Sequence, residues 1–127
     1  MIYHFNVNTT GVNTFSIPFS LSSAIKDNGG TEITPFATIA DLIKAINAQG
    51  TGDPVTVFGW WDDSAAPQKH VGLTSIAYNP DGTVNPAGCL ATGATDAATV
   101  LGMGIVPNRA YQVTVKAATT FTLTGTK

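Results

Sequence analysis

The 127-residue sequence predicts a mainly β protein, a single-domain antiparallel β-sandwich or barrel with one short α-helix at about residues 39–48. Three observations lead to this prediction. Only 11% of the residues are charged, and polarity comes mostly from Thr, Ser, Asn and Gly, which suit strands and tight turns. Several stretches alternate apolar and polar residues with a period of two, as half-buried strands do. One stretch shows a clear helical period.

The bulk properties exclude several classes of partner. The net charge of −2 and the pI of about 5.4 leave no basic stripe to neutralise phosphates, so we expect no nucleic acid as a partner. No run approaches the roughly 20 apolar residues that cross a bilayer, so no membrane insertion is expected. The single cysteine, Cys89, rules out an intrachain disulfide. We expect an extracellular, cell-surface or virion protein. Because the opening residues lack the pattern of a signal peptide, we expect that the signal was removed or that the protein leaves the cell another way.

The N-terminal residues predict a β-hairpin. In "IYHFNVN" the alternation places Tyr3, Phe5 and Val7 on one face, which we expect to be the core face. A turn around Gly11 and a second strand over residues 12–17 follow. We therefore expect these two strands to pair with each other.

The helix is predicted by "TIADLIKAINAQG". Thr38 followed three residues later by Asp41 is a variant of the capping box, and Gly50 is placed to take the left-handed conformation after the last turn. The apolar residues recur at helical spacing and should face a sheet; they are Ile39, Leu42, Ile43 and Ile46.

The second half of the chain predicts further strands. "VTVFGWW" opens a strand at Val55, and "KHVGLTSIAYNPDGTV" reads as a strand that enters a turn at residues 79–82, with a short partner strand from about Thr83. Residues 83–104, rich in small neutral side chains, are expected to form a long ordered arm or loop. The alternating stretches "RAYQVTVKA" and "TTFTLTG" predict a C-terminal hairpin.

The two adjacent tryptophans must play different roles, because successive strand side chains point to opposite faces. Simple alternation groups Trp61 with Val55 and Val57, and Trp60 with Thr56 and Phe58, which makes both faces largely apolar. That pattern is typical of a strand covered on both sides, by the main core of the sheet on one side and by the helix at residues 39–48 or a neighbouring subunit on the other. We expect at least one of the two rings in the core. In the alternative interpretation an exposed Trp stacks on a sugar, with Tyr78 nearby.

The two carboxylates that follow, Asp62 and Asp63, most simply start a turn. A surface Ca²⁺ site is the alternative, since hard cations take carboxylate oxygens, and it would need Asp53, Asp81 or Asp96 to fold nearby. A catalytic pair of carboxylates has little support, because adjacent residues in one turn do not guarantee a facing geometry across a cleft. We expect no other cofactor.

Four motifs taken together resemble a β-rich module of bacterial and archaeal surface proteins. They are, in order, "NTFSIPF", "TIADLIKAIN", "VFGWWDD" and "PNRAYQVTVKAATTFTLTG". The resemblance implies an extracellular structural or adhesive module without catalytic residues.

The sequence favours a non-enzymatic structural subunit whose partners are copies of itself. Such a subunit would assemble into an extracellular filament, a surface layer or a virion through strand edges and the segment at 83–104, since neutral side chains bury no unpaired charge. The alternative function is a carbohydrate-binding or adhesion module with glycans as partners, whose surface would use Trp60 or Trp61 together with Tyr78.

Overall fold

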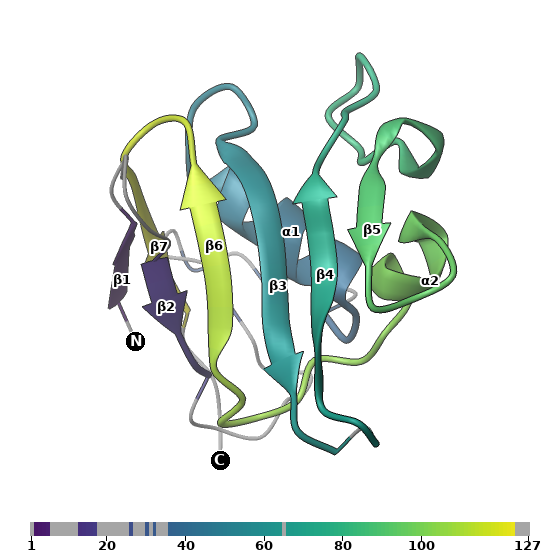
Figure 1. Ribbon diagram of the computed structural model, residues 1–127. Helices are drawn as coiled ribbons and strands as arrows, with labels where there is room; N and C mark the ends of the chain where they lie inside the picture. The colour runs from purple at the N-terminus through teal and green to yellow at the C-terminus, as the bar shows by residue number, and fades with distance from the viewer. Residues whose placement is uncertain are drawn as a thin grey trace.

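The computed structural model describes residues 2–5 (backbone only), 13–17, 26, 30, 32, 36–64 and 66–123. The predicted fold class is confirmed: the protein is mainly β, with antiparallel strand pairing and one long helix (Figure 1). The main sheet contains, from edge to edge, β2 (Asn13–Phe15), β6 (Tyr111–Val115), β3 (Val55–Asp62), β4 (Lys69–Ser75) and β5 (Leu90–Thr92). A second sheet pairs β1 (Ile2–Phe5) with β7 (Thr119–Thr122).

The long helix, α1 (Ile39–Ala48), covers one face of the main sheet and lies behind it in Figure 1. The predicted capping box is present, since the Thr38 hydroxyl accepts from the Asp41 N–H at 3.3 Å and the Asp41 carboxylate accepts from the Thr38 N–H at 2.9 Å. The predicted apolar residues are all buried: Ile39, Leu42, Ile43 and Ile46. Helical periodicity and its cap therefore located this element correctly.

The prediction of a left-handed Gly50 is wrong. The helix is capped by Gln49 in a right-handed conformation with φ −97°, and left-handed backbone first occurs at Gly52 and Asp53. Glycine is required at position 50 for space, because a β-carbon there would lie 2.6 Å from Cγ of Pro54. Position 50 thus needs a glycine because two chain segments approach closely there, and the backbone does not adopt the expected left-handed turn conformation.

Neither predicted hairpin forms. β1 pairs with β7, whereas β2 pairs with β6, so each supposed pair of neighbours is divided between the two sheets. The core assignment of Tyr3, Phe5 and Val7 lies outside the described side chains. Short connections that carry the chain from one sheet to the other have the same local turn signals as hairpins, which explains the error.

The turn expected at residues 79–82 is present. The Gly82 N–H donates to the Asn79 carbonyl at 2.9 Å, Gly82 has φ +90°, and Tyr78 bridges to Val84 in antiparallel fashion. Residues 83–104, expected to be an arm or loop, contain a 3₁₀ turn, η1 (Pro86–Gly88), then β5 and a short helix, α2 (Ala97–Leu101).

The segment at 83–104 packs on its own chain. In α2, Val100 is fully buried and Leu101 is 6% exposed, and both belong to the core. The helix begins at Asp96, whose carboxylate accepts from the Thr99 N–H at 2.8 Å, and it is capped at its other end by Gly102. This helix was missed by the sequence analysis, although Asp96 and Gly102 are recognisable helix-end signals.

A β-bulge in β3 sets the direction of its side chains. Val55 is opposite Val115, but Val57 is already opposite Thr114, so two residues of β3 face one residue of β6 there. Val55 therefore shares a face with Phe58 and Trp60, and the predicted grouping of Val55 with Val57 and Trp61 is wrong. We call the face that carries Val55, Phe58 and Trp60 the closed face, because α1 covers it.

An aromatic cluster fills the closed face across three strands. The Trp60 ring meets Tyr111 edge-on, with ring centroids 5.7 Å apart, and Tyr111 also contacts Phe58 at 5.5 Å and Phe15 at 5.9 Å. The Arg109 guanidinium lies 5.5 Å from the centroid of the Trp60 ring. Each pair of aromatic rings stabilises the fold by roughly 0.5–1.5 kcal/mol beyond the free energy gained from burying its apolar area.

The approach of β3 to β4 provides a test of this packing. Gly59 and Gly72 are opposite each other, and a β-carbon on Gly72 would overlap the Phe58 carbonyl oxygen and lie 2.5 Å from Cα of Gly59. We expect Gly72→Ala to lower the free energy of unfolding by about 2 kcal/mol or more, because rigid backbone must move. Gly102→Ala is the matched control, since its β-carbon meets nothing closer than 3.4 Å and its φ is −83°. Urea unfolding measures both; equal stability of the two variants would contradict the packing.

Candidate functional site

The second face of the main sheet, which we call the open face, is not covered by any described helix and is turned toward the viewer in Figure 1. Strand alternation and register assign its side chains. They are Thr14, Val57, Trp61, His70, Thr74, Leu90, Thr92, Gln112 and Thr114, with Gly59 and Gly72 at its centre. Trp61 is 55% exposed and Leu90 is 64% exposed.

The open face has no Asp, Glu, Lys or Arg among its described strand residues. The nearest charged strand residues, Asp62 and Lys69, are opposite each other at the ends of β3 and β4, and alternation points them to the other side. A sheet face exposed to water normally carries charged and polar side chains. This face presents instead hydroxyl groups, an amide, an imidazole and two large apolar groups.

A side-chain hydrogen bond crosses the centre of the open face. A His70 ring nitrogen, Nε2, lies 3.2 Å from Oε1 of Gln112, and the pair spans β3 above Gly59. A β-carbon at position 59 would be 2.8 Å from the His70 ring, so glycine is needed there. The bond leaves His70 half-buried, as a structural residue of the sheet surface.

The structure separates the three predicted ligand-binding residues. Trp60 is 1% exposed and belongs to the closed face, while Trp61 is on the open face. Tyr78 contacts the other end of β3, because its hydroxyl donates to the Val55 carbonyl at 2.6 Å. Six steps of one residue along the strand, roughly 20 Å, separate Val55 from Trp61. Neither tryptophan therefore shares an exposed aromatic surface with Tyr78.

Tyr78 is held in a network that ties α1 to β3. Its hydroxyl also accepts from Nδ2 of Asn47 at 2.9 Å, and Oδ1 of Asn47 accepts from the Val55 N–H at 3.1 Å. Burial raises the pKa of Tyr78 from 10.0 to about 12, partly offset by the hydrogen bond from Asn47. The phenol is consequently a structural group that links the helix, the strand and the turn.

The predicted carboxylates begin a turn. Oδ1 of Asp62 accepts from the Ser64 hydroxyl at 2.6 Å and from the Ser64 N–H at 3.0 Å, and Asp63 is exposed. Asp53, one of the suggested additional ligands, precedes β3 and is thus at the opposite end of the strand. This arrangement fits the turn interpretation of the sequence.

The carboxylates of two other suggested ligands, Asp81 and Asp96, also accept hydrogen bonds from nearby hydroxyl groups. The Thr83 hydroxyl beside Asp81 holds the pKa of that carboxyl below its usual range, and Thr99 does the same for Asp96. Among the described residues, no three His, Cys, Asp or Glu side chains come close enough to hold a metal ion. The carboxylates in these parts of the chain therefore do not assemble the Ca²⁺ ligand set that the alternative required.

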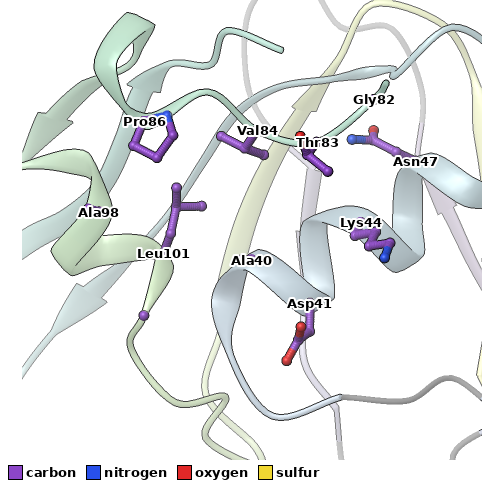
Figure 2. A pocket seen from close by; sticks show the side chains of 11 residues that line it. Ala40, Asp41, Lys44, Asn47, Gly82, Thr83, Val84, Pro86, Ala98 and Leu101 are labelled. Carbon is purple, nitrogen blue, oxygen red and sulfur yellow. The ribbon is translucent and has the colours of Figure 1, made fainter. Parts of the chain in front are cut away.

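A hollow of about 350 Å³ lies between α1, α2 and residues 82–86 (Figure 2). Its floor is apolar, with Val84, Pro86 and Leu101, and Asp41 and Lys44 of α1 stand at its rim. Sequence reasoning could not locate it, because it exists only when the segment at 83–104 folds back on the helix.

A second hollow, of about 430 Å³, lies beside Trp61 at the end of the open face. It is bounded by Trp61 and Asp63 on one side and by the connection before β6 on the other, and we call it the Trp61 hollow. Its lining residues are Trp61, Asp63, Val106, Pro107, Asn108, Arg109 and Ala110.

Comparisons of this chain with protein-family models, with curated proteins and with solved structures found no significant match. The resemblance to β-rich surface modules is therefore carried by the four sequence motifs alone. Over the described residues, none of the helices combines the length and the hydropathy needed to cross a bilayer.

The Tyr78 network predicts a specific pH dependence of stability. Because the folded-state pKa is raised above the unfolded value, Tyr78 contributes stability that is fully present below pH 10 and is lost as the pH rises toward about 12. Urea unfolding across this range should show a steeper loss of stability in the wild type than in Tyr78→Phe, which cannot ionise. Parallel curves for the two proteins would contradict the assignment.

Proposed function

We propose that the protein is a non-enzymatic structural subunit that assembles with copies of itself through the open face. The observation that supports this proposal is the absence of formal charge from the described strand residues of a broad, exposed sheet face. Most soluble proteins keep exposed sheet surfaces charged, which prevents such association.

Contact between two copies favours a neutral surface for a physical reason. In a two-fold symmetric contact the same patch of the two copies meets, so a charge near the axis approaches its own copy and a charge elsewhere has to be paired or desolvated. Thr and Gln side chains exchange hydrogen bonds with water for hydrogen bonds across the contact at little cost. Trp61 and Leu90 supply apolar area that is removed from water on association.

The proposed contact differs from the strand edges and arm expected from sequence. The segment at 83–104 is used within the chain, and the edge strands β2 and β5 are each only three residues long. Short edge strands offer few main-chain hydrogen bonds for strand addition. The open face is larger, and its neutrality agrees with a chain that has only 11% charged residues.

The setting that we propose for this assembly is outside the cell, as a filament, a surface layer or a virion. The sequence motifs that resemble surface modules support it, as does a polar surface made largely of hydroxyl groups. Electron microscopy of the native material distinguishes a filament from a layer or a shell.

Charge placed on the open face should prevent assembly. We expect the Thr14→Lys/Thr74→Lys variant to raise the dissociation constant of self-association at least about tenfold, because four ammonium groups meet in each contact between two copies. Both threonines are exposed, so the fold should tolerate the change. Sedimentation velocity over a concentration series measures the association.

Thr51→Lys is the matched control, since Thr51 is exposed in the turn between α1 and β3, away from the open face. It adds the same charge and should assemble as the wild type does. A wild-type protein that sediments as a monomer at all concentrations, or equal weakening by the control, would refute the proposal.

A further inference from the structure

The Trp61 hollow has a composition that suits a small polar ligand. Its volume of about 430 Å³ falls within the range of roughly 300–1,000 Å³ that small-molecule sites occupy. Trp61 supplies an exposed apolar surface, and the same space is lined by Asp63, Asn108 and Arg109, residues that carry a carboxylate, an amide and a guanidinium. The hollow therefore offers one flat ring and several hydrogen-bonding groups together.

The far wall of the hollow is held in a fixed shape. The Val106 N–H donates to the Tyr111 hydroxyl at 2.9 Å, and the Asn108 N–H donates to the Ile17 carbonyl at 2.8 Å. Asn108 has φ +65°, a left-handed conformation that costs free energy in a non-glycine residue and that these contacts stabilise. The wall is thus organised before a ligand arrives, which lowers the entropy cost of binding.

The charge of the hollow favours a ligand without net charge. One carboxylate, from Asp63, and one guanidinium, from Arg109, are both present, and the guanidinium already lies against the Trp60 ring. An anionic ligand would approach Asp63, and a cationic ligand would approach Arg109. A neutral molecule with many hydroxyls avoids both penalties, because each hydroxyl can donate to a carboxylate and accept from a guanidinium or an amide.

We propose that the Trp61 hollow binds a neutral saccharide, with one sugar ring stacked on the indole of Trp61 and its hydroxyls bonded to Asp63, Asn108 and Arg109. A pyranose ring has an apolar C–H face that packs on an aromatic ring and an equatorial belt of hydroxyls that reaches the polar groups around it. The inference concerns a dilute, single copy of the chain, because the proposed assembly would bury the same Trp61 ring.

Nuclear magnetic resonance of the full chain tests the site directly, because each tryptophan gives one indole N–H signal. Dilute ¹⁵N-labelled protein is titrated separately with maltohexaose, cellohexaose, chitohexaose and mannohexaose, and with an oligomer of polygalacturonate as the anionic comparison. We expect at least one neutral oligosaccharide to shift the signals of Trp61, Asn108 and Arg109 in a saturable manner. We expect the same response in the Thr14→Lys/Thr74→Lys variant, which leaves the hollow unchanged.

Variants connect the response to the residues. Trp61→Ala should lose the saturable shifts and Asp63→Asn should weaken them, whereas Leu90→Ala removes the other large exposed apolar group of the open face and should bind as the wild type does. Absence of shifts with all four neutral probes, saturation with polygalacturonate alone, or full binding by Trp61→Ala would overturn the proposal.

Discussion

The β-bulge in β3 is the constraint on which the two surfaces of the main sheet depend. Without it, Val55 would alternate away from Phe58 and Trp60, and the strand could not place all three side chains on the closed face. The extra residue near Thr56 brings Val55 to the side of Phe58 and Trp60, and regular alternation places Trp60 in the aromatic cluster and Trp61 outward. The composition of the two faces along β3 therefore depends on this irregularity at one end of the strand and on regular alternation from Val57 to Trp61.

The two faces have different physical roles. The closed face buries aromatic and aliphatic side chains between the sheet and α1, and the Asn47–Tyr78–Val55 network joins helix, turn and strand where polar backbone would otherwise be left unpaired. The open face keeps water contact with hydroxyl and amide groups and carries almost no electrostatic barrier to another molecule. Copies of the chain associate through this face, including Trp61, and in a single copy a saccharide binds the hollow beside Trp61.

Local signals in the sequence predicted local structure well. Thr38, Asp41 and the apolar spacing located α1, and the turn at residues 79–82 was evident from its Pro and Gly, because each of these signals acts within a few residues. Non-local structure was not accessible in the same way. Turn residues cannot indicate whether the next strand stays in the same sheet, so both hairpins were predicted incorrectly.

The candidate sites show the same limit. The bulge depends on the register with β6, which no period in β3 reveals, and the side of each tryptophan could therefore not be assigned. The Trp61 hollow needs residues 106–110 beside Trp61, a contact between segments more than 40 positions apart in the chain. Only α2 was missed despite visible signals, because Asp96 and Gly102 flank a helix too short for its periodicity to be recognised.

The most direct test of the two-face account is acrylamide quenching of tryptophan fluorescence in Trp60→Phe and Trp61→Phe, each measured over a range of protein concentrations. The account predicts that Trp61, alone in the first variant, is quenched readily in dilute solution and becomes protected as the concentration rises. Trp60, alone in the second, is protected throughout. Similar quenching of the two rings, or quenching of Trp61 that does not change with concentration, would contradict it.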